Sequence, residues 1–131
     1  MHTQKNGLLA TWKVPIKEPH YYRVFIWETA SALRSAIDIG EDDYFGYAGA
    51  LPYATLINED SERVRLPKKF GELHLHIGQS GVGTVAHEIQ HLLNYWIIAN
   101  GLNHDEFDEE IARLAECMTR EYWNGYYDKF E

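Results

Sequence analysis

The residues that decide the fold are VGTVAHEIQHLLNYWIIANG, at positions 82–101. Apolar side chains recur there at intervals of three and four, which is the period of an α-helix with one buried face. The pattern predicts a helix from about Val82 to Ala99, because Asn100 and Gly101 form a typical helix stop. Its expected buried stripe consists of Val85, Ile89, Leu92, Leu93, Trp96 and Ile97.

Two histidines and a glutamate interrupt this apolar helix in the order His-Glu-x-x-His. His87 and His91 are four residues apart, so both imidazoles point to the same side of a helix and can bind one metal ion. Zinc accepts histidine nitrogens and favours four ligands, so we expect one Zn²⁺ per chain. Glu88 is rotated ~100° from His87. We therefore expect Glu88 to miss the metal and to act as the general base on a water that the ion acidifies.

The third protein ligand is expected on the next helix, whose pattern starts near Phe107 or Asp108 and ends by Asn124-Gly125. Glu109 and Glu110 lie in its first turn, where the helix dipole also favours acidic residues. On a helical wheel Glu110 flanks the apolar stripe, whereas Glu109 points nearly opposite it. The wheel favours Glu110, and both alternatives stay open. The weaker candidates are Asp108 and His104.

Upstream of the motif helix the chain changes from one periodicity to another. Residues 20–27 (HYYRVFIW) are rich in aromatic and β-branched side chains and predict a strand. Residues 28–40 then show helical spacing. Residues 1–19 have no clear pattern, and we expect Pro15 and Pro19 to limit regular structure there.

The segment before the motif helix predicts further strands. Residues 44–57 favour one or two short strands, and residues 61–67 and 71–78 favour one strand each. In the last of these, His74 and His76 share one face, and we expect both at the surface of an edge strand near the cleft. They are candidate substrate-binding residues, because an edge strand can pair with an extended peptide. Strands and helices are largely segregated, which indicates an α+β fold with a small mixed or antiparallel sheet.

The composition is typical of one soluble globular domain spanning residues 1–131, with a formal net charge of -8. Such an acidic chain lacks the basic face that nucleic acid requires, so no nucleic-acid partner is expected. No stretch approaches the ~20 apolar residues of a membrane span, and none has the length of a signal peptide. A single cysteine, Cys117, fits a reducing cytoplasm.

The segments HEIQH (87–91) and DEEIARLAE (108–116) resemble those of the zincin metallopeptidases, in particular the glutamate-ligand branch called gluzincins. The chain is also similar to small proteins of phages and mobile elements, and distantly to peptidases of the ImmA/IrrE type, over about residues 71–123. The resemblance implies a minimal zincin-like fold, in which a strand runs into the motif helix and Glu109 or Glu110 completes the zinc site. It also implies a peptide or protein substrate.

One feature of the family has no counterpart here, because no Tyr or His can be identified as the residue that stabilises the oxyanion. This difference leaves an alternative function open. The chain is then a zincin-like regulatory or binding module with little or no catalytic activity, in which the zinc has a structural role. The substrate and the oligomeric state do not follow from the sequence.

Overall fold

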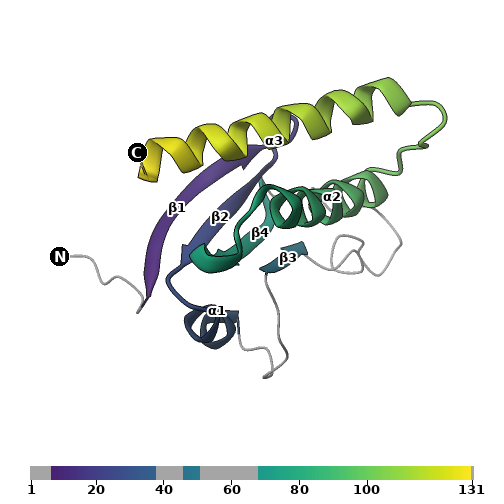
Figure 1. Cartoon of the computed structure of the whole chain (residues 1–131). Helices are drawn as coiled ribbons and strands as arrows, with labels where there is room; N and C mark the ends of the chain where they lie inside the picture. The colour runs from purple at the N-terminus through teal and green to yellow at the C-terminus, as the bar shows by residue number, and fades with distance from the viewer. Residues whose placement is uncertain (1–6, 38–45, 51–67, 131) are drawn as a thin grey trace, which may run out of the picture.

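A computed structural model describes residues 7–37, 46–50 and 68–130, with backbone alone for 46–50 (Figure 1). The described chain confirms the expected α+β class, with strands first and the two long helices last. The elements are β1 (Leu8–Pro15), β2 (Tyr21–Trp27), α1 (Ala30–Ile37), β3 (Gly46–Ala50), β4 (Lys69–His76), the 3₁₀ turn η2 (Ile77–Gln79), α2 (Val82–Ala99) and α3 (Asp108–Phe130).

The four described strands form one mixed sheet in the order β1-β2-β4-β3. β1 and β2 are antiparallel, β2 and β4 are parallel, and β3 runs antiparallel to β4. The expected mixed sheet is therefore confirmed. β4 lies between two strands, so the prediction of an edge strand at 71–78 is wrong. In the described part of the chain the edges are β1 and β3.

β1 corrects a second expectation, because residues Leu8–Pro15 form a strand where the sequence pattern indicated none. The alternation is present once the sheet is known: Trp12 and Val14 are buried, whereas Lys13 between them is exposed. Pro15 ends the strand at the edge of the sheet, where a residue without a backbone N–H is tolerated. The proline therefore limits the length of β1 without preventing it.

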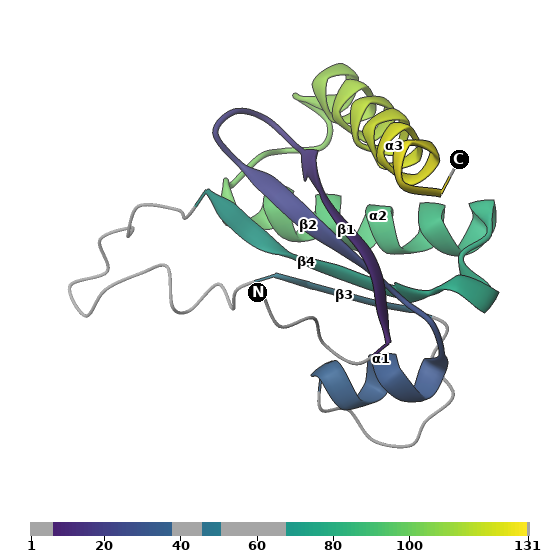
Figure 2. The same cartoon turned by 90° about the vertical axis from the view of Figure 1, so that its left-hand side faces the viewer.

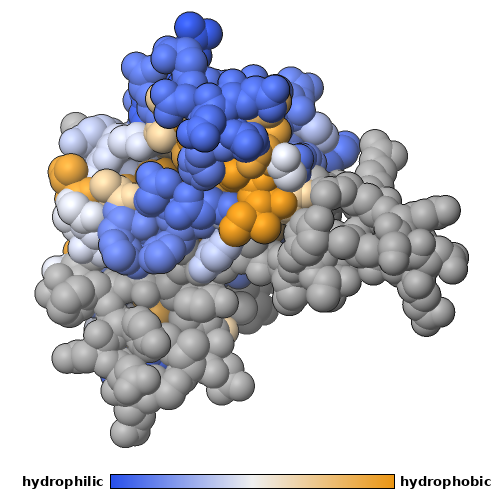
Figure 3. All heavy atoms as spheres, turned by 90° about the vertical axis from the view of Figure 1, so that its right-hand side faces the viewer, coloured by the Kyte–Doolittle hydropathy of each residue, from blue (hydrophilic) through white to orange (hydrophobic). Residues whose placement is uncertain are grey.

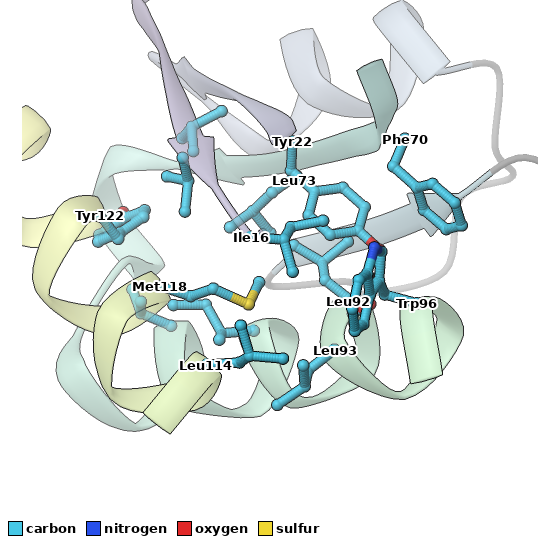
Figure 4. Packing of buried hydrophobic residues seen from close by; sticks show 14 of the residues in the cluster. Ile16, Tyr22, Phe70, Leu73, Leu92, Leu93, Trp96, Leu114, Met118 and Tyr122 are labelled. Carbon is cyan, nitrogen blue, oxygen red and sulfur yellow. The ribbon is translucent and has the colours of Figure 1, made fainter. Parts of the chain in front are cut away.

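The two long helices cover one face of the sheet (Figures 1 and 2). The side chains that fill this interface form one continuous cluster (Figure 4). Tyr22, Val24 and Ile26 point into it from β2 and are fully buried, as a period of two along the strand requires. From the helices, the cluster includes Val85, Ile89, Leu92, Leu93, Trp96, Ile97, Ala99, Ile111, Leu114, Met118 and Tyr122.

Helix α2 has the predicted bounds and the predicted buried stripe, which confirms the interpretation of residues 82–99. Two hydrogen bonds attach it to the strands. The buried Tyr22 hydroxyl donates to the Leu92 carbonyl at 2.6 Å, and the Trp96 indole N–H donates to His20 Nδ1 at 2.9 Å. The C-terminal half of α2 therefore lies beside the β1–β2 connection, which contains His20. The helix ends where Gly101 adopts a φ of 65°, as its stop signal predicts.

The opposite face of the sheet carries a smaller buried group beside α1. Trp27 alternates with Ile26 and so points away from the main cluster, and Leu33 of α1 is also buried outside it. Thr29 caps α1, because its hydroxyl accepts a hydrogen bond from the Ala32 N–H at 3.1 Å. The predicted strand at 61–67 and the second half of segment 44–57 lie outside the described residues. In the described chain no helix is long and apolar enough to cross a membrane.

Helix α3 continues beyond its predicted end at Asn124-Gly125 and reaches Phe130. Gly125 is therefore inside the helix, and its role is in packing. A Cβ atom at this position would overlap the indole ring of Trp12, so the absent side chain lets α3 approach β1. Trp12 in turn packs on Tyr122, with ring centroids 5.4 Å apart.

We expect Gly125→Ala to lower the free energy of unfolding by about 1–3 kcal/mol, because the added methyl group displaces the buried Trp12 ring. The matched control is Gly83→Ala in α2, where an added Cβ meets no atom within 4 Å. That variant should be unchanged or more stable by ~0.5–1 kcal/mol, since alanine favours a helix over glycine. Urea denaturation measures both, and a Gly125→Ala variant as stable as the original chain contradicts the packing argument.

Candidate metal centre

The orientation of α2 determines which of its side chains reach solvent. Burial of the apolar stripe against the sheet leaves His87 and His91 exposed on the outer face of the helix. Glu88 lies at the boundary between the two faces and is half-buried. Since Glu88 and His91 are three residues apart, they are neighbours on the helix surface. The described structure thus brings the three residues of the His-Glu-x-x-His motif together.

The two imidazoles are already arranged as a pair of ligands. The Nε2 atoms of His87 and His91 are 3.2 Å apart, and the ring planes meet at 82°. Two nitrogens bound to one zinc ion at 2.0–2.1 Å with a tetrahedral angle lie about 3.3–3.4 Å apart. The same separation fits a hydrogen bond between two neutral rings, in which one Nε2–H donates to the other Nε2. The separation of the two nitrogens therefore suits a shared zinc ion, for which the pair would supply two of the four ligands.

Glu88 has an environment that differs from that of the histidines. Burial raises the pKa of its carboxyl group, and the nearby His87 and His91 oppose that shift in part. In the described chain, Glu88 has no hydrogen-bond or salt-bridge partner that would hold its carboxylate. Glu88 is thus a half-buried carboxylate that follows His87 directly in the helix and precedes His91 by three residues. This arrangement suits a group that accepts a proton from a water near the pair.

Tyr95 lies beside the histidine pair, although the sequence analysis did not identify it. The ring of Tyr95 lies 6.3 Å from the His91 ring, centroid to centroid, at an interplanar angle of 18°. Tyr95 is one helical turn beyond His91, and it is 39% exposed. The four-residue spacing from His91 was a signal that could have identified this contact.

The first turn of α3 lies nearer the C-terminal end of α2 than the histidine pair does. The Lys17 ammonium, in the β1–β2 connection, contacts Glu110 Oε2 at 3.4 Å, and the same connection holds Trp96 through His20. Glu110 is thus level with the C-terminal end of α2. His87 and His91 precede Trp96 by nine and five residues, which correspond to about 13.5 Å and about 7.5 Å of helix rise.

The side of α2 that faces α3 also differs from the side that carries His87 and His91. Leu93 points toward Leu114 of α3 in Figure 4. His91 is two residues from Leu93, or ~200° around the helix, so it points to the other side. Figure 3 shows that the described surface at the end of the molecule where α2 joins α3 is hydrophilic around a central hydrophobic patch.

The acidic residues at the start of α3 have partners of their own. Besides the Lys17–Glu110 pair, Glu109 lies 3.5 Å from Arg113. Asp108 and His104 are exposed. Among the described residues no group of three or more His, Cys, Asp or Glu side chains is placed to hold a metal ion. The third ligand on α3 stays a prediction, and the placement of Glu109 and Glu110 gives it no support.

His74 corrects the expectation that this residue lies at the surface. It is 4% exposed, on an interior strand. The Trp27 indole N–H donates to its Nδ1 at 2.9 Å, and its Nε2 lies 2.8 Å from Glu72 Oε1. Because Nδ1 accepts, the neutral ring carries its proton on Nε2 and donates to Glu72. Both nitrogens are therefore engaged inside the protein, which leaves none for a substrate.

His76 follows on the same face of β4 and is half-buried. Burial lowers the pKa of its imidazole, and the positive charge of Arg34 on α1 lowers it further. His76 thus lies on the α1 side of the sheet, whereas α2 covers the opposite face. The predicted role of His76 in substrate binding stays a prediction.

We expect Glu109→Gln and Glu110→Gln each to change the zinc affinity by less than about threefold, because their carboxylates lie at the far end of α2. His91→Ala is the positive control. Its zinc affinity should fall by more than the 10- to 100-fold that is typical when a residue hydrogen-bonded to a metal ligand is lost. Competition with a fluorescent chelator measures these affinities. A loss for one glutamine variant as large as that for His91→Ala identifies that glutamate as the third ligand.

Comparison with known proteins identifies no relative from which a role could be transferred. No family model matches the chain, and neither a curated protein nor a solved structure matches it. The function has to be argued from the chain's own side chains, and those with the clearest chemistry are His87, Glu88 and His91.

Proposed function

We propose that this chain is a zinc-dependent peptidase, in which His87 and His91 bind the metal and Glu88 is the general base. The observation that carries the proposal is the 3.2 Å separation of the two Nε2 atoms on an exposed helix face, with a half-buried carboxylate beside them. Both rings are exposed, where a metal ion and a substrate can reach them.

The chemistry divides between the metal and the chain. Bound zinc supplies a Lewis acid that polarises a carbonyl group and acidifies water. Glu88 accepts the proton of the attacking water and returns it to the leaving amine, which is the role of a general base. The exposed position of the histidine pair leaves room for a chain-like substrate. These roles are those that the zincin resemblance implies.

A peptide can add to an edge strand only, and β4 is an interior strand. The edge strand that lies beside α2 is β3. In the described residues β3 has β4 as its one partner, and α2 packs against β3. A peptide that adds to the outer edge of β3 would extend the sheet beside α2. We propose that the substrate binds in this extended form, which transfers to β3 the role first expected for residues 71–78.

The alternative function is a binding module with a structural zinc. Structural zinc sites contribute directly to folding, and their ligands commonly hold together segments that lack a core. In this chain α2 is already held by its buried stripe and by the Tyr22–Leu92 hydrogen bond. Neither His87 nor His91 is buried in that interface. This arrangement favours a zinc that acts on a substrate.

We expect Glu88→Gln to bind zinc with nearly unchanged affinity and to lose peptide hydrolysis by at least ~100-fold, which is the usual contribution of a general base. Mass spectrometry of a mixed peptide library incubated with the zinc-loaded chain measures the products. Glu116→Gln, at an exposed position of α3, is the matched control and should cut like the original chain. Equal cutting by Glu88→Gln rules out the assigned role.

Removal of zinc by a chelator should leave the fold intact. The far-UV and near-UV circular dichroism should persist, because the core cluster excludes both histidines. The free energy of unfolding should fall only by the ligand-binding contribution, which is about 2.7 kcal/mol at a zinc concentration of 100 times Kd. Loss of near-UV dichroism and of a cooperative transition on chelation supports the structural-zinc alternative instead.

A further inference from the structure

The imidazole of His91 has few constraints for a metal ligand. Its Nε2 faces His87, and no other hydrogen bond is formed by its ring among the described residues. Ligand histidines are usually oriented by a hydrogen bond from the second nitrogen to a carboxylate or carbonyl. An exposed ring without such a bond is free to rotate about χ1 and χ2, and that freedom lowers the fraction of time in which it is ready to bind.

Tyr95 supplies the contact that is otherwise missing. Its ring is nearly parallel to the His91 ring, at 18° and 6.3 Å between centroids, which is within the range of offset-stacked aromatic pairs. The helix backbone that carries both rings is held in place, because the buried Tyr22 hydroxyl donates to the carbonyl of Leu92, which lies between His91 and Tyr95 in the sequence.

We propose that Tyr95 is a positioning residue, whose ring stacks on His91 and holds Nε2 directed at the partner Nε2 of His87. The inference rests on the proposed function in that it assigns the pair to a metal. The stack acts independently of the metal, because it restricts the rotation of the ligand ring in the metal-free chain. It leaves the edge of the ring that carries Nε2 open, since the contact is made through the ring face.

Two substitutions separate the ring of Tyr95 from its hydroxyl. Tyr95→Phe keeps the stack, and we expect its zinc affinity to stay within a factor of about two. Tyr95→Leu removes the aromatic ring but keeps an apolar residue with good helix propensity. Its zinc affinity should be about three- to tenfold weaker, which corresponds to the loss of one stacked pair. Tyr127→Leu on α3, 53% exposed, is the matched control and should not change the affinity.

A second readout does not need zinc. In the metal-free chain at fixed pH, the carbon-bound ring protons of His91 should show an upfield NMR shift from the Tyr95 ring current. The shift should persist in Tyr95→Phe and disappear in Tyr95→Leu. Circular dichroism verifies that each variant is folded.

The outcomes are distinct from those of the peptidase test. The proposal is overturned if Tyr95→Leu binds zinc with unchanged affinity. It is also overturned if Tyr95→Phe loses as much zinc affinity as Tyr95→Leu. Weaker zinc binding by Tyr95→Leu supports the positioning role even if Glu88→Gln shows no effect and the peptidase assignment fails. If the chain binds no zinc, the proposed function fails. The contact can then still be tested, and it is overturned if the NMR shift of the His91 ring protons is the same in Tyr95→Leu as in the original chain.

Discussion

The rotation of α2 about its own axis is the constraint on which the rest of the site depends. The buried Tyr22 hydroxyl donates to the Leu92 carbonyl at 2.6 Å, and the apolar stripe packs around this bond. A shift by one residue would turn the helix by ~100° and bring charged or polar groups against the sheet. The same packing that closes the core therefore directs His87 and His91 outward and leaves Glu88 at the boundary.

This setting gives three neighbouring residues two kinds of environment. The histidine rings remain in contact with water, where a metal ion and a substrate can reach them. The Glu88 carboxyl group is partly removed from water, which raises its pKa. A helix buried on all sides would have desolvated the histidines as well, and a fully exposed one would have left Glu88 with an ordinary pKa. The amphipathic helix thus gives the proposed ligands and the proposed base different environments.

Local pattern was sufficient to predict α2, β2 and the motif on α2, because the signals for these elements lie within the elements themselves. It was insufficient for β1, where the alternation of Trp12 and Val14 is short and its partner strand had to be known. It also misplaced His74, since a period of two assigns a face of a strand but does not say that Trp27 and α1 cover that face. Gly125 resembled a helix end until its contact with Trp12 was visible.

The predicted third ligand shows most clearly what periodicity leaves undetermined. A helical wheel gives the angle of Glu110 around the axis of α3. It gives neither the position of Glu110 along α2 nor the side of α2 on which α3 lies. The hydrogen bond from Trp96 to His20 and the ion pair of Lys17 with Glu110 fix that position at the C-terminal end of α2. A ligand from a neighbouring helix must satisfy both conditions together, because zinc bonds of ~2 Å tolerate an error in neither. Sequence spacing constrains only one of them.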